Sequence, residues 1–144
     1  MQIRKPRSAK KGNILIVEDN VISGVLLQEM LKELGYINVL LARNAEEAIE
    51  LFSDKLDLIF MDINLPDANG IELSRVFDKT YRHKDVPIIC YSTDYLRHEK
   101  ECIAAGIVDY LPKPLSHKKL KQILECWLPR RKPRAIRSSR STCP

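Results

Sequence analysis

Acids, a hydroxyl and a lysine each stand at or just beyond the end of a short apolar run in this sequence. They are Glu18, Asp19, Asp62, Ser92 and Lys113. Grouped carboxylates are ligands for a hard divalent cation such as Mg²⁺. An aspartate can also act as a nucleophile, and a lysine and a hydroxyl can bind the oxygens of a phosphoryl group. If folding brings these side chains together, they could receive such a group.

The apolar pattern predicts the elements that would position these residues. Short apolar runs alternate with helical patterns about ten to fifteen residues long, which is typical of a parallel α/β sheet. The predicted strands are 14–17, 39–42, 58–61, 88–91 and 110–111. The middle runs are continuously apolar, as expected of strands that are covered on both faces.

Five helical patterns alternate with these strands. The first ends at Gly35, the second begins at Asn44, the third follows the turn 67–70, the fourth covers about 95–105, and the fifth begins at Ser116. The apolar stripe predicted for the first helix is Ile22, Leu26, Met30 and Leu34. The residues of the second helix that are predicted to face the core are Ala45, Ala48, Ile49 and Phe52. The fifth helix carries Leu120, Ile123, Leu124 and Trp127.

This (βα)₅ pattern predicts a flavodoxin-like fold with strand order 2-1-3-4-5 and helices on both faces. In such sheets ligands bind beyond the carboxyl ends of the strands. The first and third strands are neighbours about 5 Å apart in this order, so Glu18, Asp19 and Asp62 should converge. Each acid alone would be an ordinary polar loop residue, but three together require a cation, and Mg²⁺ is the one expected. Lys113 and Ser92 should face them.

Four segments resemble a known family. They read ILIVEDN at 14–20, LIFMDINLPDANGIEL at 58–73, VPIICYSTD at 86–94 and AAGIVDYLPKPL at 104–115. In this order and spacing they resemble the response-regulator receiver domains of two-component signalling. The resemblance covers essentially all of residues 13–128.

The resemblance implies roles for the acids and for one neighbour. Asp62 would be the phosphoacceptor, and Asp19 would bind Mg²⁺ directly. Glu18 would be the second acid, which acts through metal-bound water. Asn64, two residues beyond the acceptor, would supply its main-chain carbonyl to the metal.

The resemblance also implies a switch and a phosphate ligand. Ser92, where Thr is more familiar, would follow the phosphoryl group with its hydroxyl, and Tyr110 would rotate inward with it. Lys113 would bind the phosphoryl oxygens. A cis peptide bond is implied between Lys113 and Pro114, although such bonds are uncommon in folded proteins generally.

A two-component receiver implies protein partners. The phosphoryl group would come from a phosphohistidine of a histidine kinase or histidine phosphotransfer protein, and slow hydrolysis would remove it. Phosphorylation would change the surface formed by the fourth helix, fifth strand and fifth helix, where a downstream protein would bind. Since the chain ends soon after Trp127, we expect no output domain in it. The sequence fits a stand-alone regulator, a relay intermediate or a receiver of a hybrid kinase. The start and end of the domain most resemble those of hybrid-kinase receivers.

Composition and charge divide the 144 residues into three parts. A receiver domain is predicted at 13–128, between a basic flexible tail at 1–12 and a basic tail at 129–144 whose composition predicts disorder. Of 24 basic residues, eleven lie in the tails, which leaves thirteen against nineteen acids and a net charge of −6 in between. No apolar run is long enough to span a membrane and no signal peptide precedes 14–17, so a cytoplasmic location is expected. The scattered cysteines predict reduced thiols and no zinc site.

Two alternatives remain open at this point. The domain could be a protein-interaction module that works without phosphorylation, although none of the acids nor the lysine is lost. The basic tails could contact nucleic acid, although neither aromatic residues nor a helix-turn-helix pattern accompanies their charge.

Overall fold

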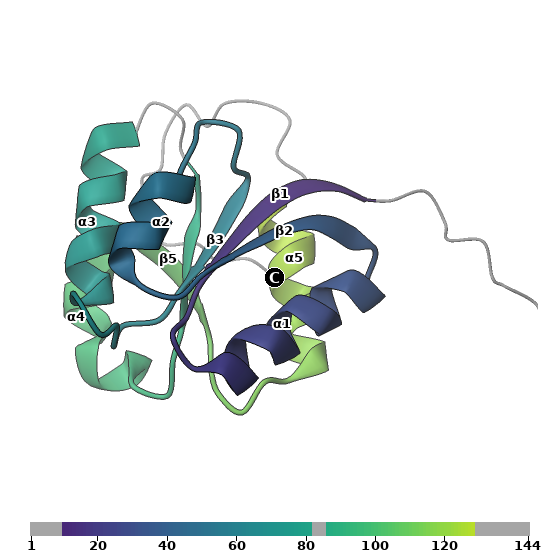
Figure 1. Ribbon diagram of the computed structural model, residues 1–144. Coiled ribbons are helices and arrows are strands. Elements are labelled where there is room, and N and C mark those ends of the chain that lie inside the picture. The colour runs from purple at the N-terminus through teal and green to yellow at the C-terminus, as the bar shows by residue number, and fades with distance from the viewer. Residues whose placement is uncertain (1–9, 82–85, 129–144) are drawn as a thin grey trace, which may run out of the picture.

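A computed structural model describes residues 10–81 and 86–128, so the predicted tails lie outside it apart from 10–12. The chain forms a sheet flanked by helices (Figure 1). The strands are β1 (Lys10–Val17), β2 (Tyr36–Ala42), β3 (Leu58–Met61), β4 (Ile88–Tyr91) and β5 (Ile107–Leu111). The helices are α1 (Val21–Glu33), α2 (Ala45–Leu51), α3 (Gly70–Tyr81), η1 (Tyr95–His98), α4 (Glu99–Ala104) and α5 (His117–Trp127). Because β1 begins at Lys10, residues 10–12 belong to the sheet.

The sheet has the predicted topology. Its strand order is β2-β1-β3-β4-β5, and every neighbouring pair is parallel. β3 and β4 have the predicted bounds, whereas β1, β2 and β5 begin earlier than predicted. In the register of β1 and β3, Val17 pairs with Met61, so both strands end at the same level.

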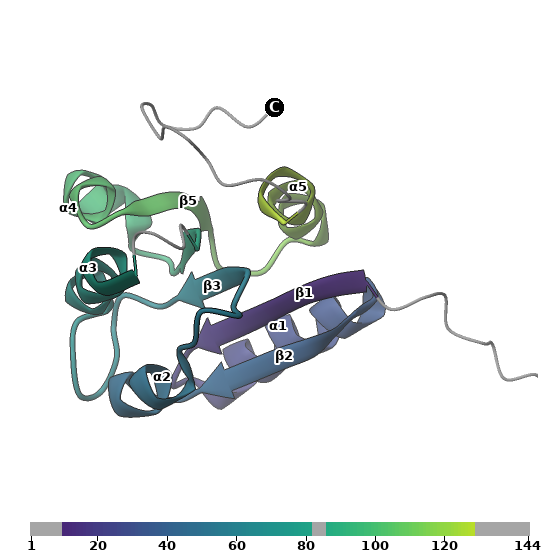
Figure 2. The ribbon, with the colours of Figure 1, turned by 90° about the horizontal axis from the view of Figure 1, so that it is seen from above.

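Helices cover both faces of the sheet. α1 and α5 lie on one face, and α2, α3 and α4 lie on the other (Figure 2). Successive residues of β1 enter opposite cores: Ile14 and Ile16 pack with α1 and α5, and Leu15 and Val17 pack on the other side. All four are fully buried. The continuous apolar run of β1 is therefore explained by burial on both faces.

The stripe predicted for α1 is wrong in its first half, whereas its last two residues, Met30 and Leu34, are partly buried against the core. Ile22 is 77% exposed and Leu26 is 46% exposed. The buried residues are instead Gly24, Leu27 and Leu31. A Cβ on Gly24 would lie 3.1 Å from Leu41 Cδ1, so the missing side chain lets this face approach the sheet closely. Because α1 is apolar on more than one face, close approach at Gly24, and not apolarity alone, selects the face that is buried.

α2 departs from its prediction at one residue. Ala45, Ala48 and Phe52 are buried as expected, but Ile49 is 56% exposed. The three buried residues recur at helical spacing and define one face. Ile49 follows Ala48 directly and is therefore turned about 100° away from that face.

The last two helical predictions fare differently. The four apolar residues expected to pack from α5 are all buried, as predicted. The predicted fourth helix is divided into the 3₁₀ turn η1 and the short helix α4. No helix within residues 10–81 and 86–128 is long and apolar enough to cross a membrane.

Cys90 and Cys102 are buried and free, but Cys126 is disulfide-bonded, so the prediction of reduced thiols is wrong there.

Candidate functional site

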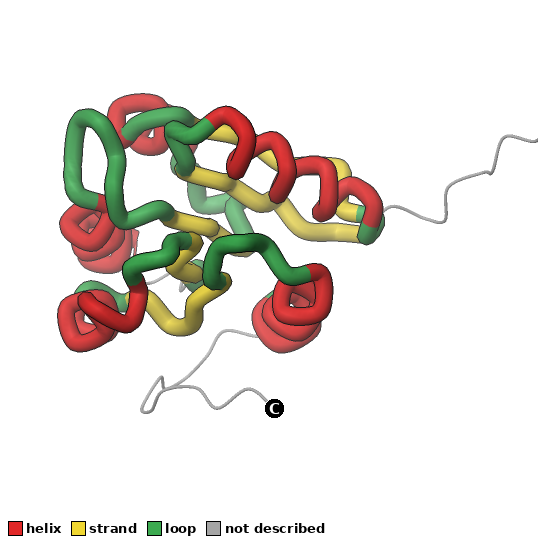
Figure 3. The backbone as a smooth tube through the Cα atoms, turned by 90° about the horizontal axis from the view of Figure 1, so that it is seen from below, coloured by secondary structure: helices red, strands yellow, loops and turns green. Residues whose placement is uncertain are grey.

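The carboxyl ends of the strands meet at one edge of the sheet, where loops surround them (Figure 3). Main-chain hydrogen bonds continue past the ends of β1 and β3. The N–H of Asp62 donates to the carbonyl of Val17 (3.0 Å), and the N–H of Glu18 donates to the carbonyl of Ala42 (2.9 Å). These bonds hold Glu18 and Asp62 on adjacent chains at the same level.

Three carboxylates converge there, as the strand order predicted. Glu18, Asp19 and Asp62 each present an oxygen, and these atoms lie within 4.8 Å of one another. Glu18 is 1% exposed and Asp62 is 6% exposed, whereas Asp19 is exposed. Oxygen ligands at this spacing, two of them buried and one open to solvent, fit a hard divalent cation.

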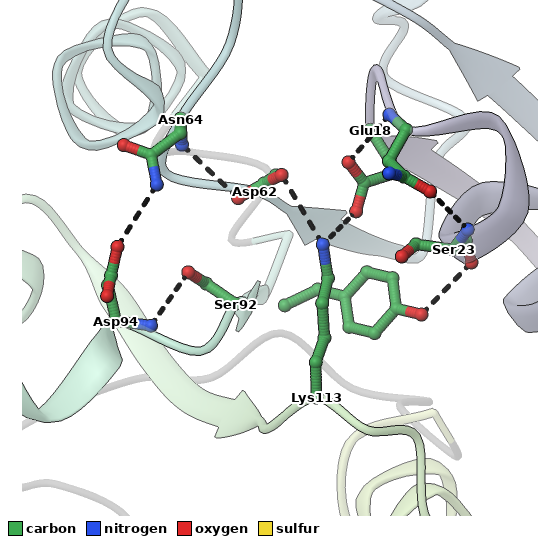
Figure 4. A network of polar contacts seen from close by, with 9 residues as sticks. Glu18, Ser23, Asp62, Asn64, Ser92, Asp94 and Lys113 are labelled. Atoms are coloured by element: carbon green, nitrogen blue, oxygen red, sulfur yellow. Dashed lines mark hydrogen bonds and ion pairs between the residues drawn. The ribbon is translucent and has the colours of Figure 1, made fainter.

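Lys113 reaches this cluster from the segment that follows β5. Its Nζ contacts Glu18 Oε1 and lies 3.5 Å from Asp62 Oδ2 (Figure 4). The lysine side chain is 19% exposed. The peptide bond between Lys113 and Pro114 is cis, as predicted. The ammonium therefore lies between the two buried carboxylates.

Burial and the neighbouring charge alter the acidity of Asp62. Its pKa is raised to about 7, chiefly by burial and further by the hydrogen bond and charge of Glu18. The charge of Lys113 and the hydrogen bond from the Asn64 N–H lower the pKa, but they do not offset the other effects. One ammonium thus compensates two buried carboxylates incompletely, which favours binding of an additional cation.

Asn64 and Ser92 lie on the side of Asp62 away from Glu18 (Figure 4). The Asn64 N–H donates to Asp62 Oδ1 (3.2 Å), and its Nδ2 donates to Asp94 Oδ2 (3.1 Å). Ser92 is buried, and its Oγ accepts from the Asp94 N–H (3.0 Å). Within the described part of the chain, no hydrogen bond joins Ser92 to Asp62. Asp94 therefore links the loop after β3 to the segment after β4.

Tyr110 is the predicted site residue that stands apart from the others. Its ring is half-buried and stacks on that of Tyr95, with centroids 4.3 Å apart and an angle of 3° between the planes. Lys119 Nζ lies 5.2 Å from the Tyr110 centroid. The structure thus gathers the acids, Asn64 and Lys113, places Ser92 beside them, and leaves Tyr110 against η1.

The fold and the site geometry agree with the family suggested by the sequence. The family model of the response regulator receiver domain matches residues 14–125. The chain belongs to this family. Its receiver domain therefore accounts for most of the sequence.

Known proteins with similar sequences include a sensor protein and transcriptional regulatory proteins. The aerobic respiration control sensor protein ArcB of Escherichia coli is 35% identical over 106 residues, which cover 72% of this chain and 14% of ArcB. The transcriptional regulatory protein CpxR of Escherichia coli is 32% identical over 110 residues, which cover 76% of this chain and 46% of CpxR. The chain thus matches about a seventh of one relative and less than half of the other.

One solved structure is similar to this chain over nearly the whole length of the solved structure. The receiver domain of a Pseudomonas aeruginosa sensor histidine kinase is 32% identical, with a TM-score of 0.73. The match covers 83% of this chain and 98% of that one. That receiver was crystallised with a magnesium ion coordinated in its active site cleft.

The loop between β3 and α3 holds site features that the sequence prediction treated only as a turn. A Cβ on Gly70 would lie 1.9 Å from the carbonyl oxygen of Asp62, so only glycine fits there. The carboxylate of Asp67 accepts from the N–H groups of Ala45 (2.8 Å) and Glu46 (3.1 Å), which ties this loop to α2. The hydrogen bond from Ala45 is the main cause of a lowered pKa at Asp67. The Asn-Gly pair signals a turn, but no sequence signal connects residue 67 to α2.

Tyr91 is a second neighbour of the site that the sequence prediction missed. As the last residue of β4 it was expected only to fill the core, and it is indeed buried. The structure also places Lys113 Nζ 4.7 Å from its ring centroid. Its hydroxyl donates to the carbonyl of Ser23 in α1 (3.0 Å). Both contacts depend on side-chain direction, which strand periodicity does not specify.

Proposed function

We propose that this receiver domain accepts a phosphoryl group on Asp62 from a phosphohistidine of a histidine kinase or a histidine phosphotransfer protein. One observation carries the proposal: the buried Asp62 carboxylate lies beside the Lys113 ammonium and within 4.8 Å of two further acids. A nucleophile, a cation for phosphoryl oxygens and candidate metal ligands are therefore next to one another. The expected cytoplasmic location is part of this proposal.

The donor set fits Mg²⁺. The carboxylates of Glu18, Asp19 and Asp62 would hold the ion together with the main-chain carbonyl of Asn64. Bound Mg²⁺ would supply positive charge that offsets the negative charge of the phosphoryl oxygens. The raised pKa of Asp62 supports this assignment, because burial and then the neighbouring Glu18 disfavour the charged carboxylate more than Lys113 favours it.

The side chains suggest how transfer would proceed. An oxygen of the Asp62 carboxylate attacks phosphorus, and the bond from phosphorus to the histidine nitrogen breaks. The imidazole leaves with that electron pair and takes up a proton. Lys113 contacts one phosphoryl oxygen, and the Ser92 hydroxyl, which accepts from Asp94, keeps its own proton to donate to another. In the reverse switch, water attacks phosphorus, releases inorganic phosphate and restores the carboxylate.

Ser92 and Tyr110 are proposed to relay the change to the surface of α4, β5 and α5. Ser92 would donate its hydroxyl proton to a phosphoryl oxygen, and Tyr110 would move relative to Tyr95. A downstream protein would read the altered surface. The competing idea of a phosphorylation-independent module offers no reason for a lysine between two buried acids. The nucleic-acid alternative concerns the tails, which lie outside the described residues.

The exposed face of α1 is where we propose that the donor protein binds. α1 begins two residues after Asp19, and it exposes Val21 (58%), Ile22 (77%), Val25 (43%) and Leu26 (46%). Adjacent exposed apolar side chains commonly mark a protein contact. Ile22→Asp should therefore slow transfer from a phosphohistidine protein roughly tenfold and leave transfer from acetyl phosphate unchanged. An equal effect on both donors would contradict this assignment.

The function can be tested by intact-mass measurement. The chain is incubated with Mg²⁺ and a panel of autophosphorylated histidine kinases, in parallel with the Asp62→Asn variant. The expected result is a gain of one phosphoryl mass in the wild type and none in the variant. No gain with any donor would favour the phosphorylation-independent module, and labelling of Asp62→Asn would show that another residue is the acceptor.

A further inference from the structure

Tyr91 touches two parts of the site that are distant in sequence. Its ring lies under the ammonium of Lys113, at 4.7 Å from Nζ to the centroid. Its hydroxyl donates to the main-chain carbonyl of Ser23 in the first turn of α1 (3.0 Å). The side chain is 1% exposed. One rigid, buried residue at the end of β4 therefore contacts both the lysine and the helix that follows the acids.

These contacts are part of a closed circuit. The Ser23 N–H donates to Asn20 Oδ1 (2.9 Å), and the Asn20 N–H donates to Glu18 Oε2 (3.0 Å). Glu18 Oε1 in turn contacts Lys113, which lies over the ring of Tyr91. Figure 4 shows Glu18, Ser23 and Lys113 in this arrangement. Each member is held by two others, and Tyr91 closes the circuit between the lysine and α1.

The surroundings keep the Tyr91 phenol neutral. Burial is the first cause of its raised pKa, about 12, and the negative charges of Glu18 and Asp62 raise it further. A hydrogen bond with the Ser23 side chain acts in the opposite direction without offsetting them. At neutral pH the hydroxyl therefore remains a donor to Ser23. The ring also presents an uncharged face to the ammonium, which is the geometry of a cation–π contact.

We propose that Tyr91 is a positioning residue that holds Lys113 and the acidic loop 18–20 in a single arrangement. This inference rests on the proposed function and adds to it a residue outside the phosphoacceptor, metal and switch sets. The carboxylates of Glu18 and Asp62 attract the Lys113 ammonium from one side, and the ring of Tyr91 limits the movement of the ammonium on another side. The hydroxyl holds the first turn of α1, and through Asn20 it also holds Glu18.

Two substitutions separate the ring from the hydroxyl. Tyr91→Phe keeps the ring and removes the bond to Ser23, so it should weaken Mg²⁺ binding roughly two- to tenfold and leave the phosphorylation rate at saturating Mg²⁺ within about twofold of the wild type. Tyr91→Leu also removes the ring, so it should lower that saturating rate roughly five- to thirtyfold. Mg²⁺ affinity is measured by calorimetry without a donor, and rates are measured by intact mass with acetyl phosphate.

A matched control is available at the opposite end of the sheet. Lys10 Nζ lies 5.4 Å from the centroid of Tyr36, which is 9% exposed. Tyr36→Leu therefore removes the same kind of lysine–tyrosine contact far from the acids. It should lower thermal stability without changing Mg²⁺ affinity or the saturating rate. If Tyr36→Leu and Tyr91→Leu alter both quantities equally, Tyr91 contributes only to general stability and the proposal fails.

Amide hydrogen exchange tests the circuit independently of Mg²⁺ and of phosphorylation. Tyr91→Phe should speed exchange at the N–H groups of Asn20 and Ser23 roughly two- to tenfold, and Tyr36→Leu should not. Unchanged exchange in Tyr91→Phe would overturn the positioning role. A wild-type chain that takes no phosphoryl group would instead contradict the proposed function, so the two failures are distinguishable.

Discussion

The two halves of the site differ in how their side chains are held. In the charged half, Glu18, Asp62 and Lys113 contact one another and are largely buried. In the switch half, Ser92 accepts from Asp94 and Tyr110 stacks on Tyr95, so neither is bonded to Asp62. The charged half is already arranged to bind ions, whereas the switch half must form new contacts to respond to a phosphoryl group.

Sheet position explains the difference between the acids and Tyr110, although Lys113 follows the edge strand β5 and Ser92 follows the interior strand β4. β1 and β3, which carry the acids, are interior strands, and each pairs with a strand on both sides. β5, which carries Tyr110, is an edge strand that pairs only with β4. Tyr95 lies in a 3₁₀ turn, where hydrogen-bond geometry is poorer than in an α-helix. Elements with fewer neighbours change position at lower cost, so we expect movement at the edge and rigidity at the centre.

The largest difference between the halves should appear on removal of the lysine. Lys113→Met leaves two buried carboxylates without their cation, so the free energy of unfolding should fall by roughly 3 kcal/mol without Mg²⁺. Mg²⁺ should restore part of the loss. Urea denaturation measures both effects. The control is Lys119→Met. Lys119 Nζ lies 4.0 Å from Asp109 Oδ1, and the lysine side chain is 34% exposed. The free energy of unfolding should therefore fall by less than about 1 kcal/mol in this variant. Equal losses in the two variants would contradict the comparison.

The charged half should also give stability a characteristic pH dependence. The pKa of Asp62 is raised from the ordinary 3.8 to about 7 in the folded chain. Between these two pH values, the folded state therefore binds more protons at Asp62 than the unfolded state does. Without Mg²⁺, the free energy of unfolding should therefore fall as pH rises from about 4 to 7 and then level off. Asp62→Asn should lack this decline and be more stable than the wild type at pH 8 by roughly 1–3 kcal/mol. Parallel pH profiles for the two proteins would rule out this account of Asp62.

The smallest effect is expected in the switch half. Ser92→Ala removes one hydrogen bond, that from the Asp94 N–H, so the free energy of unfolding should fall by about 1 kcal/mol or less. Asp62 should still gain a phosphoryl group, since the nucleophile and Lys113 remain. Urea denaturation and intact mass test both points. A loss of stability as large as that of Lys113→Met would show that the two halves are not held differently.

Sequence patterns predicted the parts of the fold that depend on burial alone. The uninterrupted apolar runs gave β3 and β4 their correct bounds, and the single apolar face of α5 identified its packing residues. α1 is apolar on more than one face, so periodicity did not distinguish the stripe of Ile22 from that of Leu27. The contact between Gly24 and Leu41 decided between them, and it exists only once α1 packs on β2.

The same distinction applies to the site. Convergence of the three acids was predictable because the carboxyl ends of adjacent parallel strands meet at one edge. The partners of individual side chains were not predictable in this way. Tyr91 meets Lys113 and Ser23, and Asp67 meets Ala45, through contacts between segments remote in sequence. Such contacts depend on loop paths and rotamers, which strand and helix periodicity does not encode.

The central claim is that Asp62 carries the phosphoryl group, and chemical trapping tests it most directly. The chain is incubated with acetyl phosphate and Mg²⁺ and then treated with borohydride, which reduces an aspartyl phosphate to homoserine. Peptide mass spectrometry locates the product. We predict homoserine at position 62, with none formed when Mg²⁺ is chelated. Homoserine at Asp19 or another aspartate, or a phosphoryl mass gain without homoserine, would contradict the assignment of Asp62 as the acceptor.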